Sequence, residues 1–248
     1  MNKEFDLALS LGNNCKPTFY LKKFKLFSFA GPLDWMITDS LNSIAALFKE
    51  NFATYFVNTK EINPEHIKGS KKTHRYIRDI KNKVVSMHHF PLDIPIEKFK
   101  PRFLKLLKRR FEKMHRFIKM SESILFLSCR DETIEDFKIF LKEFANIYPG
   151  KKITLINIRH KADTRGIIEK FSLKNIEIID YTADDTHPGD KTSENEYWTG
   201  NIVNWETILS NIRLSNKFII LRLVMKMKHV ICKFLNSYGL LRCKFYKK

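Results

Sequence analysis

A strand, a helix and a second strand follow one another between residues 123 and 158, and this pattern constrains the fold more than any other feature of the sequence. Ser123–Ser128 is an apolar run typical of a buried strand, Ile134–Tyr148 has the apolar periodicity of a helix, and Ile153–Ile158 is a second apolar run. Pro149–Gly150 provides the turn between helix and strand. Two strands joined through a helix predict a parallel pair with a right-handed crossover.

Further apolar runs extend this pattern toward both ends of the chain. Residues 5–11 form a short apolar run that ends in a Gly-Asn-Asn turn, and residues 176–181 form another, preceded by a short helical pattern over 167–171. Strands are therefore expected near 5–11, 124–128, 153–158 and 176–180, with helices between them. This order predicts an α/β fold with a mostly parallel, Rossmann-like sheet flanked by helices.

Helical spacing of apolar residues marks three more helices. They are expected over Cys15–Phe24, Leu41–Phe56 and Phe99–Met120, the last of which is long and very basic. Val84–Phe90 is typical of a strand that ends at a proline. Residues 58–82 are polar and contain proline and glycine, so they predict a long surface excursion.

Positive charge is concentrated at the carboxyl-terminal end of the chain. The 248 residues have a net charge of +18, part of which follows from the general abundance of lysine. Residues 1–206 account for +8 of it, and no acidic residue follows Glu206. The ten basic residues after this point are Arg213, Lys217, Arg222, Lys226, Lys228, Lys233, Arg242, Lys244, Lys247 and Lys248. Such a segment predicts contact with an anionic surface.

A helix over Lys217–Leu235 would sort this segment into two faces. Four side chains would form one cationic stripe, namely Arg222, Lys226, His229 and Lys233. The apolar residues between them would form a second face, as in helices that lie on anionic lipid. We therefore expect an α/β domain at 1–206, a basic amphipathic C-terminal helix within 207–248, and an anionic membrane surface bound through residues 213–248. The alternative is the same helix docked on the sheet with its lysines in solvent.

Several classes of protein are not expected from this sequence. The four cysteines form no CxxC pair and follow no secretory signal, which favours a reducing, cytoplasmic setting. No run approaches the roughly 18 to 20 apolar residues of a spanning helix, so the protein is expected to lie on the inner face of the membrane without crossing it. The motifs GxGxxG, GxxxxGKS/T and HExxH are absent, and no metal-type Cys/His cluster occurs. No cofactor, metal or nucleic-acid partner is predicted.

Cys15 is the first candidate for chemistry. It lies at the start of the predicted helix 15–24, where the positive end of the helix dipole favours the thiolate, the nucleophilic form of cysteine. Gly12, Asn13 and Asn14 precede it at the carboxyl end of a predicted strand, the edge at which α/β sheets bind ligands. These three residues are therefore candidates for substrate binding. The alternative is a cysteine that only fills space, since free cysteine is often buried.

Three segments share features with a known family. They are SLGNNCKPTFYLKKFKLFSFAGPLDW at 10–35, SMHHF at 86–90 and KRRFEKMHRF at 108–117. Over most of residues 5–130 the chain resembles a bacterial family of unknown function catalogued as putative papain-like cysteine peptidases. Leu33 stands where that family usually has phenylalanine before Asp-Trp.

The resemblance implies a catalytic pair. Cys15 matches the nucleophile proposed for that family, and His88 or His89 matches the base that keeps the sulfur ionised and later protonates the leaving group. Strand alternation places the two histidines on opposite faces, so only one of them can face Cys15. Asp93 and Asp131 are candidates for a third group that orients the imidazole. A strand-end pair of histidines making surface hydrogen bonds is the alternative.

Asp34 and Trp35 allow two interpretations. The aspartate could cap the helix that follows while the indole fills the core. In the other interpretation the two residues form a wall of the active site close to Cys15 and bind substrate.

Three functions remain open at this point. The first is a cysteine-dependent, papain-like hydrolase or acyl-transfer enzyme that acts on amides or thioesters. The second is a membrane-associated, glycosyltransferase-like enzyme of cell-envelope polysaccharide synthesis, favoured by the predicted parallel sheet and the basic tail. The third is a peripheral membrane binding module without catalysis. The parallel sheet counts against a true papain fold, in which a helix packs against an antiparallel barrel.

Overall fold

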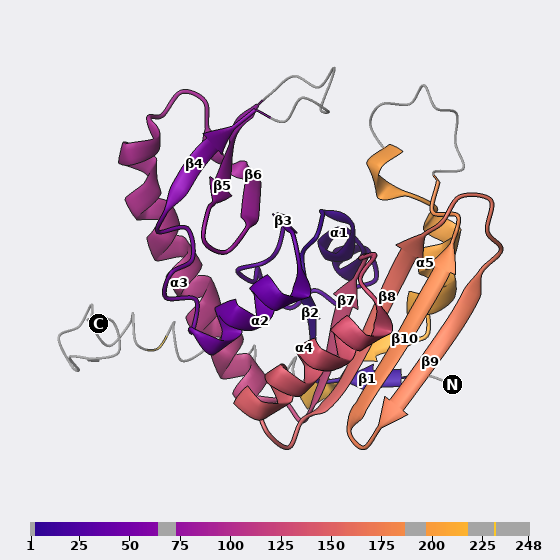
Figure 1. Ribbon diagram of the computed structural model, residues 1–248. Coiled ribbons are helices and arrows are strands. Elements are labelled where there is room, and N and C mark those ends of the chain that lie inside the picture. The colour runs from indigo at the N-terminus through magenta and orange to yellow at the C-terminus, as the bar shows by residue number, and fades with distance from the viewer. Residues whose placement is uncertain (1–2, 64–72, 187–196, 218–230, 232–248) are drawn as a thin grey trace.

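A five-stranded sheet forms the centre of the protein (Figure 1). The computed structural model describes residues 3–63, 73–186, 197–217 and 231. The strand order is β2-β7-β8-β10-β9, in which β2, β7, β8 and β10 run parallel and β9 runs antiparallel to β10. Their bounds are β2 (Leu7–Ser10), β7 (Ser123–Ser128), β8 (Lys152–His160), β9 (Ile167–Leu173) and β10 (Ile176–Ala183). The mixed α/β class and the mostly parallel sheet are therefore confirmed.

The helix expected over 167–171 is wrong, because these residues belong to β9. Leu173 pairs with Ile176, which leaves a two-residue hairpin loop whose first residue, Lys174, has a φ of 51°. Positive φ in such a loop fits the twist of two antiparallel strands. The run is also too short for a stable helix and contains two β-branched isoleucines, which suit a strand.

Helices cover both faces of the central sheet. Their bounds are α1 (Lys16–Lys23), α2 (Leu41–Lys49), α3 (Ile96–Met120), α4 (Ile134–Ile147) and α5 (Ile202–Leu209), with a 3-10 turn, η1, at Tyr197–Thr199. Residues of α2, α3 and α4 share one buried core with one face of the strands, and residues of α1 and α5 share a second core with the other face. In the second core the rings of Tyr20 and Trp205 stack with centroids 4.2 Å apart. Burial on both faces explains why β7 is an almost unbroken apolar run.

A second, antiparallel sheet lies beside the first and is made from residues 36–91. Its order is β3-β6-β5-β4, with bounds β3 (Met36–Thr38), β4 (Thr59–Ile62), β5 (His74–Asp79) and β6 (Val84–Pro91). The predicted strand at 84–90 is confirmed as β6. The surface excursion expected over 58–82 is wrong in part, since it contains β4 and β5. Both strands are largely polar and partly exposed, so they lack the apolar pattern that reveals a buried strand.

Helix ends differ from the expected ones for local reasons. The helix expected to reach Phe56 ends at Lys49, because Asn51, Phe52 and Phe56 all adopt positive φ. The end expected near Tyr148 is close to that of α4, which begins with a capping box between Thr133 and Asp136.

The carboxyl-terminal segment is described only in part. A small parallel sheet pairs β1 (Lys3–Phe5) with β11 (Ile212–Leu214), so residues just after α5 return to the start of the chain. The predicted basic helix over 217–235 lies outside the described residues except for Lys217 and Ile231. The C-terminal helix, the division at 206/207 and a Rossmann-like arrangement of the sheet stay predictions. Within the described ranges, no helix has the length and hydropathy that a membrane span requires.

Candidate active site

The loop between β2 and α1 brings Cys15 to the carboxyl edge of the central sheet. Gly12 and Asn13 both adopt positive φ, of 73° and 75°, which turns the chain out of the strand. A Cβ on Gly12 would lie 3.0 Å from Cγ2 of Thr38, so this position requires glycine for space as well as for conformation. Cys15 is the N-cap residue of α1, as the sequence predicts, and its side chain makes no capping hydrogen bond.

Side chains on neighbouring elements hold this loop in place. The amide N–H of Asn13 donates to Oγ1 of Thr38 at 3.0 Å, and that hydroxyl donates to the carbonyl of Leu11. Nδ2 of Asn14 donates to Sγ of Cys129 at 2.8 Å. Gly12, Asn13 and Asn14 therefore lie beside Cys15, where the sequence places them, and two of the three fix the loop by their own hydrogen bonds.

A buried arginine supports the same hydroxyl. Arg130 is only 1% exposed. Its Nη1 donates to Oγ1 of Thr38 at 2.6 Å, and its Nη2 donates to the backbone carbonyl of Thr38 at 3.0 Å. Its Nε donates to Glu132 at 2.8 Å. Oγ1 of Thr38 thus accepts from Asn13 and Arg130 and donates to Leu11, which uses its full hydrogen-bonding capacity. Neither Thr38 nor Arg130 is predictable as a site residue, since a Cys-Arg-Asp segment after a strand carries no recognisable motif.

His88 reaches Cys15 from the antiparallel sheet. Its Nε2 lies 3.3 Å from Sγ of Cys15. Ser86 of β6 pairs with Ile77 of β5, and Phe90 pairs with Arg75. The chain thus advances by four residues along β6 but by only two along β5, which is a β-bulge in β6. This bulge interrupts the simple alternation expected for the strand and re-aims the side chains at its centre. Only one histidine faces Cys15, as expected, and the geometry identifies it as His88.

His89 is engaged elsewhere and cannot serve the same sulfur. Its Nε2 lies 3.2 Å from Nη1 of Arg110, and its Nδ1 lies 2.9 Å from Oγ of Ser86. Because arginine only donates, Nε2 of His89 accepts and Nδ1 carries the hydrogen that Ser86 receives. Burial, reinforced by the positive charge of Arg110, lowers the pKa of His89 to about 3. This histidine is neutral at pH 7 and has both nitrogens occupied.

Cys15 and His88 form a neutral pair at pH 7. Burial, and to a lesser extent the nearby Cys129 thiol, raises the pKa of Cys15 to about 11. Partial desolvation of this largely exposed ring, followed by the charge of His74, lowers the pKa of His88 from its ordinary value of 6.5. The thiolate expected from the helix terminus is therefore wrong for the resting protein, because desolvation of the sulfur outweighs the helix dipole at this position.

Asp34 holds a turn, and Trp35 contacts the histidine. The carboxylate of Asp34 accepts from the N–H of Gly31 at 2.6 Å and from Oγ1 of Thr18 at 3.1 Å, and burial raises its pKa to about 6. It caps no following helix, since β3 begins at Met36. Trp35 has a φ of 64°, and its ring meets that of His88 edge-on with centroids 6.4 Å apart. Trp35 therefore lies beside His88, and substrate binding by Asp34 and Trp35 stays a prediction.

Neither predicted orienting carboxylate contacts His88. Asp93 is exposed and makes no described hydrogen bond, and Asp131 uses its backbone carbonyl to accept from Arg159 at 2.6 Å. Among the described residues, no group of three or more His, Cys, Asp or Glu side chains could hold a metal ion.

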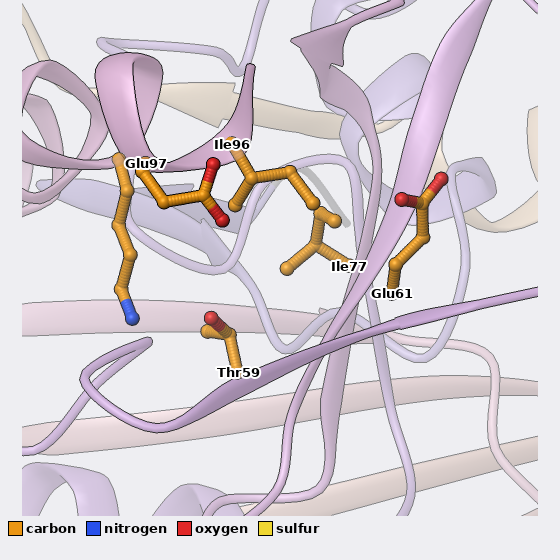
Figure 2. A pocket seen from close by; sticks show the side chains of 6 residues that line it. Thr59, Glu61, Ile77, Ile96 and Glu97 are labelled. Atoms are coloured by element: carbon orange, nitrogen blue, oxygen red, sulfur yellow. The ribbon is translucent and has the colours of Figure 1, made fainter.

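A pocket elsewhere in the protein is separate from this pair. Figure 2 shows it between β4, β5 and the start of α3, with a volume of about 300 Å³. Its lining residues are Thr59, Glu61, Ile77, Ile96, Glu97 and Lys100. Neither Cys15 nor His88 lines it, so it is not the candidate site.

The fold and the Cys15–His88 contact together define a thiol–imidazole site on a mixed α/β domain. A family model described as "Putative papain-like cysteine peptidase (DUF1796)" matches residues 6–147. Since this match covers more than half of the chain, the protein belongs to that family. The family description supports a cysteine-dependent hydrolase in broad terms and gives no support to acyl transfer or to a membrane-associated transferase. No curated protein and no solved structure matches the chain.

Proposed function

We propose that this protein is a cysteine-dependent hydrolase in which Cys15 supplies the nucleophile and His88 the base. The observation that carries the proposal is the 3.3 Å contact between Sγ of Cys15 and Nε2 of His88. A nucleophile and a base within such reach are the geometric requirement for covalent catalysis. Amides and thioesters are the substrate class, because their carbonyl carbon accepts a sulfur nucleophile.

Because the resting pair is neutral, the proton moves during the attack. His88 with its hydrogen on Nδ1 accepts the thiol proton at Nε2 while Sγ bonds to the carbonyl carbon and the carbonyl oxygen becomes an oxyanion. Collapse of this intermediate restores the carbonyl and breaks the bond to the leaving group, which takes the proton from His88. A water deprotonated by His88 then hydrolyses the thioester, releasing the acid and restoring the thiol.

The backbone N–H of Cys15 is the candidate donor to the oxyanion. Among the described residues no hydrogen bond uses this N–H, and it belongs to the same residue as the attacking sulfur. Donors fixed near the developing charge stabilise it without having to reorganise. The adjacent N–H of Lys16 is not free for this role, since it donates to Oδ1 of Asn14 at 2.9 Å.

Trp35 takes the place of the third polar group in this mechanism. No hydrogen bond from a described residue reaches Nδ1 of His88, and the edge of the Trp35 ring packs against the imidazole instead. The ring of Trp35 also lies 4.9 Å from Nζ of Lys22. The imidazole is thus oriented by packing, and its basicity is not increased by a carboxylate.

Acylation by p-nitrophenyl acetate tests the nucleophile without a known substrate. We expect one acetyl group per chain, located on Cys15 by mass spectrometry and released by hydroxylamine. Cys15→Ala should accept none, whereas Cys129→Ser, which removes the neighbouring thiol but keeps an acceptor for Nδ2 of Asn14, should be acylated like the wild type. Acetylation confined to lysines, or equal acylation of Cys15→Ala, would refute the assignment of the nucleophile.

The pH dependence of alkylation tests the base. With His88 present, the rate of reaction of Cys15 with iodoacetamide should change little between pH 7 and pH 9, because His88 is already neutral and can take the thiol proton. In His88→Gln the rate should rise about tenfold per pH unit over this range, as the free thiol titrates toward a pKa of about 11. His89→Gln is the matched control and should retain the wild-type profile. Identical profiles for wild type and His88→Gln would exclude His88 as the base.

A further inference from the structure

Helix α3 carries a row of exposed positive charges along its whole length. It contains ten basic and only two acidic residues in Ile96–Met120. Six exposed cations follow one another at spacings of three, four or seven residues, and we call them the α3 stripe: Lys98, Arg102, Lys105, Arg109, Arg116 and Lys119. At 3.6 residues per turn they fall within about 100° of arc and span about 30 Å along the axis. One acidic residue, Glu112, interrupts the row.

The α3 stripe lies opposite the face that packs on the domain. The buried residues of α3 are Phe103, Leu107, Met114, Phe117 and Ile118, which form the other side of the helix. In Figure 1, α3 forms one side of the molecule, far from β9 at the other side. The row of cations is therefore presented outward from a helix that the core holds in place.

Carboxylates do not neutralise these charges. None of the six cations forms an ion pair with an acidic group in the described part of the chain, and like charges three or four residues apart repel one another. Helix α4 differs, since Lys138 pairs with Glu135 at 2.5 Å and both signs alternate on its surface. An external anion would relieve the repulsion along α3.

We propose that the α3 stripe is a docking surface for an anionic lipid bilayer. A helix lying on a flat surface touches it along a single line, and the cations lie along a single line. Nucleic acid fits less well, because single strands are bound through exposed aromatic side chains that stack on bases. The four phenylalanines of α3 are buried or half-buried, so none of them is exposed for stacking on a base. Neither Cys15 nor His88 belongs to this surface, since both lie outside Ile96–Met120.

Vesicle binding by the full chain tests the proposal. The probes are vesicles of phosphatidylglycerol and phosphatidylcholine, vesicles of phosphatidylcholine alone, and a single-stranded DNA. We expect binding to the anionic vesicles only, and loss of about a hundredfold in affinity for Lys105→Gln/Arg109→Gln/Arg116→Gln, since each cation near an anionic surface contributes about fivefold. Binding by the wild type should also weaken as salt rises from about 0.05 to about 0.5 M.

A matched variant separates position from net charge. Lys161→Gln/Lys170→Gln/Lys174→Gln removes three exposed lysines, one directly after β8, one in β9 and one in the loop between β9 and β10, and changes the net charge equally. It should bind like the wild type, and both variants should keep the wild-type circular dichroism and iodoacetamide labelling of Cys15. Equal losses in the two variants, no loss in the α3 variant, no vesicle binding by the wild type, or a stripe-dependent preference for DNA would each overturn the proposal.

Discussion

The loop before Cys15 and the bulge that carries His88 hold the two halves of the candidate pair in different ways. Hydrogen bonds at Asn13 and Asn14 fix the loop, and the Thr38 hydroxyl behind it is itself held by Arg130. For His88 the described residues show one polar contact, to the sulfur, and an edge-on ring contact with Trp35. The sulfur is therefore carried by a loop that hydrogen bonds hold, whereas the imidazole is oriented by ring packing. Changes behind the loop should cost stability, and changes at His88 should not.

Arg130→Met should have the largest effect on stability. It removes a fully buried guanidinium, so that Oγ1 of Thr38 loses one of its two donors and the Thr38 carbonyl loses the donor Nη2, at a cost of about 3 kcal/mol or more. The free energy of unfolding in urea measures this. Arg78→Met is the control, since Arg78 is partly exposed in an ion pair with Asp39 and its loss should cost less than about 1 kcal/mol. Equal costs for the two variants would show that the loop does not depend on Arg130.

Thr38→Val should come next, at about 2 kcal/mol. Valine has nearly the same shape but leaves the N–H of Asn13 and Nη1 of Arg130 without an acceptor. Thr38→Ser keeps the hydroxyl and should cost less than about 1 kcal/mol. The valine variant should also slow iodoacetamide labelling of Cys15 or make it heterogeneous. Serine and valine variants of equal stability would mean that the hydroxyl contributes no more than the methyl group and that its hydrogen bonds do not hold the loop.

His89 should make stability depend on pH. Its folded pKa of about 3 lies below the value of 6.5 expected when unfolded, so the unfolded chain binds more protons between these values. The contribution of neutral His89 to stability is therefore lost as pH falls from about 6.5 toward 3. His89→Gln can keep both hydrogen bonds without titrating, so the difference in unfolding free energy between wild type and variant should change between pH 7 and pH 5. A constant difference would contradict the assigned neutral state.

His88→Gln should have the smallest effect on stability. The side chain is exposed, and glutamine has a similar reach, so the free energy of unfolding should change by less than about 0.5 kcal/mol. Thermal and urea unfolding at pH 7 would detect a larger change. A cost comparable to that of Thr38→Val would mean that the bulge depends on this imidazole and that the two halves of the pair are held alike.

The sequence predicts the central sheet better than the antiparallel one. Continuous apolar runs reveal β2, β7, β8 and β10 because both faces of these strands are buried. The strands β4 and β5 were missed because they are short, polar and half-exposed. Residues 167–171 predict a helix and form part of β9 instead, because a run of five residues is too short to distinguish the helical period from the strand period.

Two parts of the site can be predicted from the sequence: Cys15 as the nucleophile, and a base that is either His88 or His89. The family resemblance selects Cys15 and the pair at 88 and 89, but strand periodicity cannot foresee a bulge, and the bulge determines which ring meets the sulfur. The roles of Thr38 and Arg130 depend on contacts between residues 92 positions apart in sequence, which carry no local signal. The pKa of Cys15 depends on burial, which a helix terminus alone does not reveal.

The connection between β2 and β7 has a consequence for how the protein folds. Leu7 of β2 pairs with Ile124 of β7, Ile124 pairs with Ile153 of β8, and Ile153 pairs with Ile176 of β10. The strands β2 and β7 are therefore separated by far more of the chain than the other two pairs of strands. Helix α1, the antiparallel sheet and α3 all lie within that one connection. Closing a long loop costs more entropy and slows folding. We expect β7, β8 and β10 to assemble first and β2 to add last, so that Cys15 and His88 meet only at the end of folding and partly folded chains lack the reactive pair.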